Sequence, residues 1–211
     1  MIHKIEGIMT YDEFVKYVGD KLEGSTERFV VARIDIDNFD AVNRYYGEMI
    51  GDEVIEKMAY VLKQNLKATD MLCWVQKDDF NILLDHIDIR TAAVIVEEIR
   101  EHIERKPFQL KDGKREIRLK MSAGIAAFPK HGQNKEVLIE RAFSALKQAK
   151  QEGKNRVVIA ESEEMEQRAV YYMKSQLKSL NKLSQRTEKT EALLLREALD
   201  NLITKYQGNK S

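Results

Sequence analysis

The chain has 211 residues, of which 43% are hydrophobic and 33% are charged, a composition typical of globular rather than disordered proteins. Its 35 Lys and Arg residues balance 35 Asp and Glu residues, so the net charge offers no general attraction to nucleic acid or to an anionic membrane. We therefore expect no nucleic-acid partner. The single cysteine, Cys73, excludes an internal disulfide and fits a reducing compartment. With no signal pattern and no apolar run approaching roughly 18 residues, we expect a cytoplasmic protein with no membrane span.

Hydrophobic periodicity predicts the elements in chain order. Apolar residues at helical spacing, bounded by capping residues, Gly or Pro, predict helices over residues 10–24, 38–47, 51–70, 89–106 and 134–155. Runs rich in β-formers predict strands at 28–36 and 156–160, a hairpin of 71–75 with 80–84, and a second hairpin within 108–128. This order indicates an α/β (α+β) fold with helices packed on a sheet.

The composition changes near residue 161, after which the chain has no Gly or Pro until Gly208. We expect one long helix or two, broken near 184–191, where polar residues interrupt a heptad-like apolar seam. Two arrangements stay open, a helix folded onto the sheet domain and a helical pair that forms a dimer or binds a partner. The predicted organisation is a helical segment over 1–27, a main domain over 28–160 and a C-terminal helical extension over 161–211.

The segment 32–54, ARIDIDNFDAVNRYYGEMIGDEV, carries the main candidate site. A predicted strand ends at Asp35 and Asp37, whose side chains we expect on opposite faces, and a helix follows. A strand-end carboxylate beside a helix N-terminus can hold Mg²⁺ while free N–H groups receive phosphate oxygens. An EF-hand loop is excluded, because its central Gly and terminal Glu are missing. We expect Asp37 and Asn38 to cap the helix, and Asp35 to bind metal if the 71–84 hairpin supplies a second carboxylate.

The chain resembles the GGDEF family of diguanylate cyclases from about residue 28 to residue 159. The resemblance rests on the segment 35–84, on SAGIAAFPKHG (122–132) and on AFSALKQAKQEGKNRVVI (142–159). It implies a mixed sheet wrapped by helices, related to polymerase palm and nucleotidyl-cyclase domains. It also implies that a homodimer with antiparallel domains joins two GTP molecules into cyclic di-GMP with the help of metal ions.

Carried over residue by residue, the resemblance assigns the metal to Asp35, to the carbonyl of Ile36 and to Asp78. An active enzyme would use Asp35, Asp78 and Asp79 as its catalytic residues. The cofactor implied is Mg²⁺.

The resemblance also implies a guanine-nucleotide site. Asn43 and Asp52 would read the guanine edge, because a carboxylate accepts from its N1–H and amine and an amide can both donate and accept. Lys150 and Lys154 would bind phosphate. Lys154 stands where the family usually has arginine, which keeps the charge but loses the bidentate fork.

The largest departure from the family lies in the hairpin turn, where Gln76-Lys77-Asp78-Asp79-Phe80 replaces Gly-Gly-Asp/Glu-Glu-Phe. Two glycines that permit positive φ and close backbone approach are lost. Asp79 is one methylene shorter than the family's glutamate, and a displacement of about 1 Å in a catalytic site can lower a rate roughly a hundredfold. In addition, Lys67-Ala68-Thr69-Asp70 replaces the Arg-x-x-Asp of the family's inhibitory product site.

We therefore favour a degenerate GGDEF domain that binds GTP or GDP with Mg²⁺ and has little or no diguanylate cyclase activity. It would act as a regulatory module and pass nucleotide occupancy to a protein partner through the C-terminal helices. Two alternatives stay open. One is an active diguanylate cyclase with an unusual turn, and the other is a dimerisation scaffold that binds no nucleotide.

Overall fold

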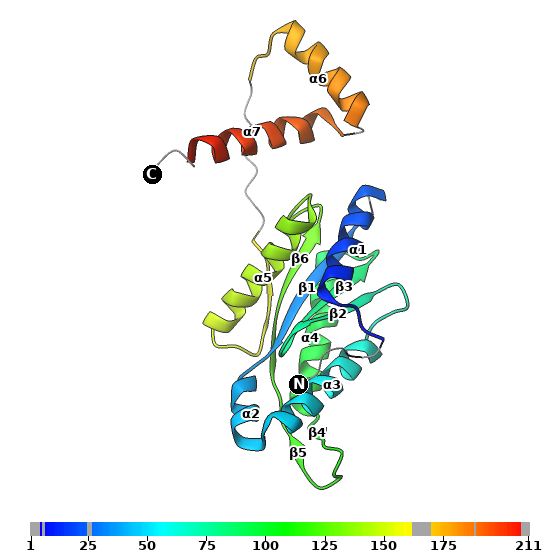
Figure 1. The fold of residues 1–211 in the computed structure, drawn as a ribbon, viewed down its shortest axis with the longest axis vertical. Helices are drawn as coiled ribbons and strands as arrows, with labels where there is room; N and C mark the ends of the chain where they lie inside the picture. Colours follow the sequence, from blue (N-terminus) through cyan, green and yellow to red (C-terminus); the bar gives the residue numbers. More distant parts are fainter. Residues whose placement is uncertain (1–4, 6, 25–26, 162–169, 188, 208–211) are drawn as a thin grey trace. The chain divides into compact units, whose positions relative to one another are not determined.

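The computed structural model describes residues 5, 7–24, 27–161, 170–187 and 189–207 (Figure 1). The chain divides into two compact units, residues 1–163 and residues 164–211, and each is described by itself. The first unit contains a five-stranded sheet with helices on both faces. The second contains a pair of helices.

The sheet has the strand order β2-β3-β1-β6-β7. All neighbouring strands are antiparallel except β6 and β7, so the sheet is mixed as expected. Its strands are β1 (Phe29–Ile36), β2 (Met71–Gln76), β3 (Asp79–Asp85), β6 (Met121–Phe128) and β7 (Val157–Ile159). A separate small sheet pairs β4 (Phe108–Gln109) with β5 (Glu116–Ile117). The second predicted run of the 108–128 hairpin is therefore divided, because residues 118–120 leave the ladder between β5 and β6.

The helices of the first unit cover the two faces of the sheet (Figure 1). One face packs against α3 and α4, and the other packs against α1 and α5. The helices are α1 (Tyr11–Gly24), α2 (Phe39–Tyr46), α3 (Glu48–Gln64), α4 (Ile89–Arg105) and α5 (Lys135–Gln151). The second unit contains α6 (Lys174–Thr187) and α7 (Glu191–Gln207), so the predicted break in the tail is confirmed.

Successive residues of β1 alternate between the two cores, as the period of two in a strand requires. Val30 and Ala32 lie in the core shared with α3 and α4, whereas Phe29 and Val31 lie in the core shared with α1 and α5. Cys73 is buried in the second core, where it packs as a small apolar residue. Burial raises the pKa of its thiol to about 12, so the thiolate does not form near neutral pH.

Gly124 of β6 lets α5 approach the sheet closely. A Cβ at this position would overlap backbone atoms of Ala142, Ala145 and Leu146 in α5. Because the helix lies so close, its last turn carries Lys150 over the end of β1. The sequence of β6 thus helps to position the candidate site.

Candidate functional site

The candidate site lies at the end of β1, which runs between β3 and β6. Asp35 is the cross-strand partner of Asp79 on β3 and of Ser122 on β6. Two carboxylates directly opposite each other in a ladder repel one another. The surrounding cations reduce this repulsion.

Lys150 supplies the first cation. Its Nζ donates hydrogen bonds to Oδ1 of Asp35 and, at 2.7 Å, to Oδ1 of Asp37. These bonds outweigh the effect of burial and raise the pKa of Lys150, while burial raises the pKa of Asp35. The prediction that Asp35 and Asp37 point to opposite faces was wrong, because one ammonium group contacts both. Residues two apart in an extended chain share a face.

Asp37 links three parts of the chain and has a structural role. It accepts hydrogen bonds from Ser122 Oγ at 2.7 Å and from the Asn155 N–H at 2.8 Å, in addition to Lys150. Its side chain is 2% exposed. The predicted capping role of Asp37 was wrong, because these partners occupy the carboxylate.

Asn38 stands at the N-cap position of α2 but makes no side-chain capping hydrogen bond. Its φ of 59° places it in the left-handed region, and its Oδ1 accepts from Lys154 Nζ at 2.5 Å. The capping prediction for Asn38 was therefore wrong as well. Lys150 and Lys154 both reach from the end of α5 and the following turn to the corner after β1.

Arg33 supplies the second cation, which was not among the residues predicted from the sequence. Its Nη2 donates to Asp79 Oδ2 at 2.8 Å, and its Nε lies 3.4 Å from Asp79 Oδ1. Nη1 lies 3.4 Å from Asn81 Oδ1, and the guanidinium stacks 5.5 Å from the centre of the Phe143 ring. A charged residue inside an otherwise apolar strand was the available signal, because such a residue requires a partner.

The predicted 71–84 hairpin is confirmed, with Lys77 and Asp78 as its turn. Lys77 has φ 45°, in the left-handed region that glycine adopts without strain. Trp74 Nε1 donates to the Lys77 carbonyl at 2.8 Å and helps to hold this conformation. A non-glycine residue there costs on the order of 1 kcal/mol.

Asp78 follows in the turn and lies near Asp35. Burial and then the Asp35 charge raise the pKa of the Asp78 carboxyl to about 7. Its carbonyl accepts a hydrogen bond from the Ile36 N–H at 3.4 Å. A protonated carboxyl is a poor metal ligand, so cation binding here is coupled to loss of a proton.

The two residues expected to read guanine belong to α2 and α3. The Asn43 side chain lies directly over Gly51, where a Cβ would overlap its Oδ1 and crowd the Phe39 ring. Gly51 is thus required for the position of Asn43, and Asp52 is the next residue. Because Gly51 has no side chain, the Asn43 amide lies close to the backbone next to Asp52.

The donor set fits Mg²⁺ only in combination with phosphate. Among the residues that the structure describes, no group of three or more His, Cys, Asp or Glu side chains could hold a metal ion by itself. Asp35 and Asp78 provide two carboxylates of the kind that bind Mg²⁺, which usually completes its shell with waters and substrate phosphates. These residues therefore fit a cation that arrives with a phosphorylated ligand.

Comparison with known proteins identifies the fold and the family. The family model described as "Diguanylate cyclase, GGDEF domain" matches residues 10–156. The chain belongs to the GGDEF family. The GGDEF domain of PA1120 (YfiN or TpbB) from Pseudomonas aeruginosa matches with a TM-score of 0.70 at 24% identity, covering 74% of this chain and 98% of that one. At this identity the likeness shows the fold alone.

Two curated relatives extend the comparison. The response regulator PleD of Caulobacter vibrioides is 34% identical over 125 residues, which are 59% of this chain and 28% of PleD. The bifunctional diguanylate cyclase/cyclic di-GMP phosphodiesterase MucR of Pseudomonas aeruginosa is 29% identical over 191 residues, 90% of this chain and 27% of MucR. The chain thus spans less than a third of the length of either relative. No helix in the described ranges combines the length and apolarity that a bilayer span needs.

A cavity of about 300 Å³ opens beside the carboxylates of this GGDEF domain. Lys147 Nζ lies 4.5 Å from the centre of the Phe143 ring at its wall. The lining residues are Asp35, Asp79, Phe143, Leu146, Lys147, Lys150 and Gln151. The cavity is continuous with the candidate site, since the two carboxylates and Lys150 belong to both.

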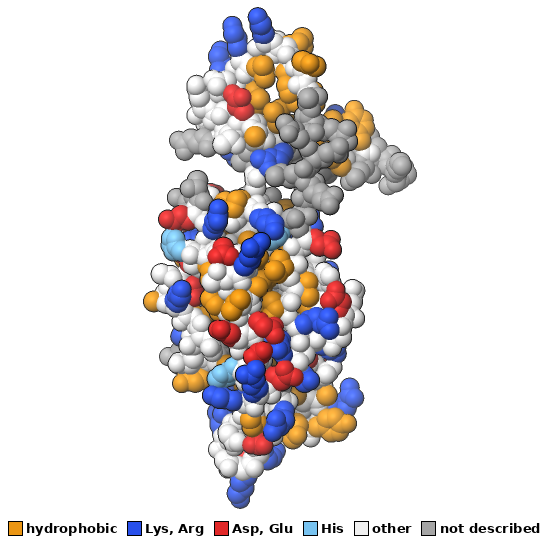
Figure 2. Space-filling model, turned by 180° about the vertical axis from the view of Figure 1, so that it is seen from behind, with side chains coloured by type: hydrophobic (Ala, Val, Ile, Leu, Met, Phe, Trp, Pro, Cys, Tyr) orange, Lys and Arg blue, Asp and Glu red, His pale blue; other side chains and the backbone are white. Residues whose placement is uncertain are grey.

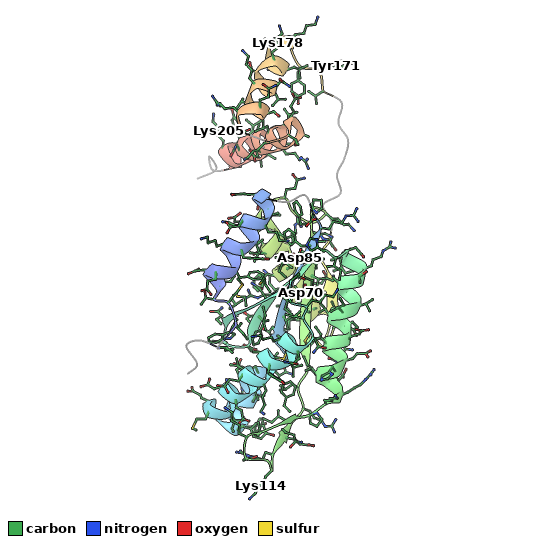
Figure 3. The ribbon with its side chains drawn as sticks, turned by 90° about the vertical axis from the view of Figure 1, so that its right-hand side faces the viewer. Asp70, Asp85, Lys114, Tyr171, Lys178 and Lys205 are labelled. Atoms are coloured by element: carbon green, nitrogen blue, oxygen red, sulfur yellow. The ribbon has the colours of Figure 1, made fainter. Side chains whose placement is uncertain are left out.

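Asp70, at the position of the family's inhibitory product site, is bound to the backbone. Its Oδ2 accepts from the Lys67 N–H and its Oδ1 accepts from the Asp85 N–H, both at 2.9 Å. Figure 3 shows Asp70 and Asp85 close together. The carboxylate therefore joins the turn before β2 to the end of β3.

Proposed function

We propose that this GGDEF domain acts in cyclic di-GMP signalling by binding GTP or GDP with Mg²⁺, and that it has little or no diguanylate cyclase activity. The observation that carries the proposal is the pairing of Asp79 with the buried Arg33. Asp79 occupies the position of the glutamate in the family's turn. Its carboxylate is held by a guanidinium group, so it is not available for a metal or a reacting hydroxyl without breaking that pair.

Retention of nucleotide binding is supported by the groups outside the turn. Asn43, seated on Gly51, and the adjacent Asp52 present the amide and carboxylate that suit a guanine edge. Lys150 and Lys154 converge on the corner after β1, where their charges favour phosphate oxygens. These groups do not depend on the altered turn.

A magnesium ion would be held by Asp35, Asp78 and the carbonyl of Ile36. When bound, it would neutralise phosphate charge and draw electron density from the phosphorus. Lys150 would have to move for the metal to bind, because its ammonium group is hydrogen-bonded to the Asp35 carboxylate. Nucleotide phosphates offer Lys150 an alternative anionic partner, so metal and nucleotide binding should be cooperative.

Loss of catalysis is supported by charge as well as by geometry. Withdrawal of Asp79 from Arg33 would leave a guanidinium unpaired in a side chain that is only 9% exposed. Separating one partner of a buried pair costs about 3–5 kcal/mol. If a reaction required that withdrawal, its rate would fall by about two to four orders of magnitude.

The alternative of an active cyclase is favoured by one observation, the acidic character retained at Asp35, Asp78 and Asp79. In that case two copies would have to meet as a homodimer. A scaffold that binds no nucleotide is the remaining alternative, and the C-terminal helices would then serve only for association.

One experiment separates the three readings. The protein is incubated with labelled GTP and Mg²⁺ at high concentration, and bound nucleotide, free nucleotide and products are then resolved. Our proposal expects bound GTP that is recovered unchanged, with affinity lowered at least tenfold by Asn43→Ala. Cyclic di-GMP formed over many turnovers would establish the cyclase instead, and no binding by the wild-type protein would leave the scaffold.

A further inference from the structure

Positive charge is concentrated in the β4–β5 hairpin and the residues on either side of it. Residues 105–120 contain seven Lys or Arg residues and two acidic residues, which gives this stretch a net charge of +5. Because the whole chain is neutral, the remaining residues carry an equal negative charge. A balanced net charge therefore does not exclude a strongly basic local surface. The basic residues, all of them exposed, are Arg105, Lys106, Lys111, Lys114, Arg115, Arg118 and Lys120.

The alternation of side chains directs much of this charge to one side of the hairpin. Ile117 and Leu119 are buried in the core shared with α3 and α4, whereas Arg118 and Lys120 are exposed. Successive side chains of an extended chain point to opposite sides, so the exposed pair shares one face. The buried pair anchors the hairpin in the core and gives its outer face a defined position.

The turn of the hairpin projects from the domain. Gly113 has φ 67°, and no atom lies within 4 Å of the position that a Cβ would occupy there. Figure 3 shows Lys114 at the outermost point of this end of the first unit. The basic surface is therefore convex at its tip, unlike the grooves with which proteins follow a nucleic-acid strand.

Three of the basic residues have no ion pair within the described part of the chain, namely Lys106, Lys114 and Arg118. Each of the other four has an acidic partner. The pairs are Arg105 with Glu101, Lys111 with Glu56, Arg115 with Asp112, and Lys120 with Glu104. The nearest acidic side chains are thus engaged already, and the unpaired cations produce a positive potential that attracts an anionic surface.

Exposed apolar side chains lie on α3 on either side of the hairpin. Glu53 accepts a hydrogen bond from the Lys111 N–H, and Glu56 accepts one from Lys111 Nζ at 2.8 Å, so the hairpin meets α3 at these two residues. Met49 precedes Glu53 by four residues and Tyr60 follows Glu56 by four, a spacing that places them on the same face of the helix. Met49 is 86% exposed and Tyr60 is 65% exposed. Figure 2 shows hydrophobic side chains beside Lys and Arg side chains at this end of the domain.

We propose that the β4–β5 hairpin and the adjoining face of α3 dock on the surface of an anionic lipid bilayer. The unpaired cations would contact lipid phosphates, and each Lys or Arg near such a surface strengthens binding about fivefold. Met49 and Tyr60 would enter the interface, where tyrosine is favoured. The basic residues lie outside the candidate nucleotide site, so docking does not require a bound nucleotide.

Nucleic acid is the rival polyanion, and the shape and composition of the surface argue against it. A two-stranded ribbon can enter a major groove, but β4 and β5 have only two residues each. Met49 has no flat ring on which a base could stack. A bilayer surface accommodates a convex tip, and stable peripheral binding combines positive charge with inserted apolar groups, as this surface does.

The test uses the full-length chain and lipid vesicles. Co-sedimentation compares vesicles made from equal parts of phosphatidylglycerol and phosphatidylcholine with vesicles of phosphatidylcholine alone. We expect binding to the anionic vesicles that weakens as salt is added, and binding to the neutral vesicles that is at least roughly tenfold weaker.

The variant Lys106→Ala/Lys114→Ala/Arg118→Ala removes the three unpaired charges. Its binding to the anionic vesicles should be weaker by roughly a hundredfold, at about fivefold for each charge. Because all three side chains are exposed, its melting temperature should equal that of the wild-type chain.

The matched control is Lys16→Ala/Arg90→Ala/Lys130→Ala. It also removes two lysines and one arginine from the first unit, all three exposed and without an ion pair among the described residues. These charges lie outside the proposed surface, and salt screens their effect on it. The control should therefore change vesicle binding by less than about twofold.

A fluorescent label reports whether α3 reaches the bilayer. Cys73 is buried, so a thiol introduced by Met49→Cys can be labelled selectively with a polarity-sensitive dye. Its emission should shift to shorter wavelength on the anionic vesicles. A label attached after Lys130→Cys should not respond.

Several results would overturn the proposal. One is a wild-type chain that does not bind the anionic vesicles, and another is an equal loss of binding in the hairpin variant and in its control. Equal binding to the neutral vesicles would show that the cations do not recognise the lipid. No change in the emission of the label at residue 49 would exclude α3 from the surface. Binding to a labelled DNA duplex without binding to vesicles would identify nucleic acid as the partner instead.

Discussion

Replacement of Arg33 by methionine tests the central feature of the candidate site. Methionine keeps most of the side-chain length but removes the charge, so it leaves Asp79 unpaired among buried residues. The Arg33 and Asp79 side chains are 9% and 17% exposed. Loss of one partner of a buried pair costs about 3–5 kcal/mol. Because Asp79 also lines a cavity that water can enter, we expect the lower end, about 3 kcal/mol.

A double-mutant cycle isolates the interaction. Asp79→Asn leaves the Arg33 charge with only amide partners and should cost about 2 kcal/mol. The Arg33→Met/Asp79→Asn protein contains neither charge, so its loss should be about 2–3 kcal/mol rather than the additive value of about 5. The difference, a coupling of at least about 2 kcal/mol, is large against the few tenths found for independent sites.

The measurement is urea unfolding followed by the fluorescence of Trp74, the single tryptophan of the chain, which lies in β2 and so reports on the sheet domain. Arg105→Met is the control, because Arg105 pairs with Glu101 at 2.6 Å but is 74% exposed. An exposed pair contributes less than about 1 kcal/mol. Additive losses in the cycle, or an Arg33→Met loss no greater than that of the control, would refute the reasoning.

Three further predictions concern the same domain. Gly51→Ala should lower guanine-nucleotide affinity at least tenfold and lower the free energy of unfolding by about 1–3 kcal/mol, because the new methyl group displaces Asn43. Calorimetry measures the affinity and thermal melting the stability. Unchanged affinity would show that Asn43 is not part of the nucleotide site. Because the pKa of Asp78 is raised to about 7, the native state holds a proton that the unfolded state has lost between about pH 4 and pH 7. The free energy of unfolding should therefore fall as pH rises through this range. Asp78→Asn should make the free energy of unfolding less dependent on pH in the same range. Asp37→Ala should lower the free energy of unfolding by about 3 kcal/mol, because the Ser122 hydroxyl and the Asn155 N–H lose a buried acceptor. A melting temperature within about 2 °C of wild type would contradict this.

Hydrophobic periodicity was sufficient to predict most of the helices and strands, whereas the mixed sheet was implied by the family resemblance. The strand predicted over 28–36 is β1, which begins one residue later, at Phe29. The predicted 71–84 hairpin is present although Lys77 occupies a position suited to glycine. These predictions succeeded because alternation and helical spacing report which side of an element is buried. The break between α6 and α7 was visible for the same reason.

Interactions between segments that are far apart in the sequence could not be predicted from hydrophobic periodicity. Asp37 and Asn38 were expected to cap the neighbouring helix, because capping is the local use of such residues. Their actual partners, Asn155 and Lys154, lie more than 100 residues away in the chain. Arg33 was missed for a similar reason, since its partner Asp79 becomes its neighbour only when β1 and β3 pair.

The bonds of Asp37 also bear on how this protein matures during synthesis. Asp37 is translated early, whereas Ser122 and Asn155 follow 85 and 118 residues later. Until Lys150 leaves the ribosome, the growing chain holds the Asp35 and Asp37 carboxylates without their lysine, and β7 joins the sheet only after Asn155 has followed. The first strand of the sheet to be made therefore completes its contacts only when the last part of the domain has been made.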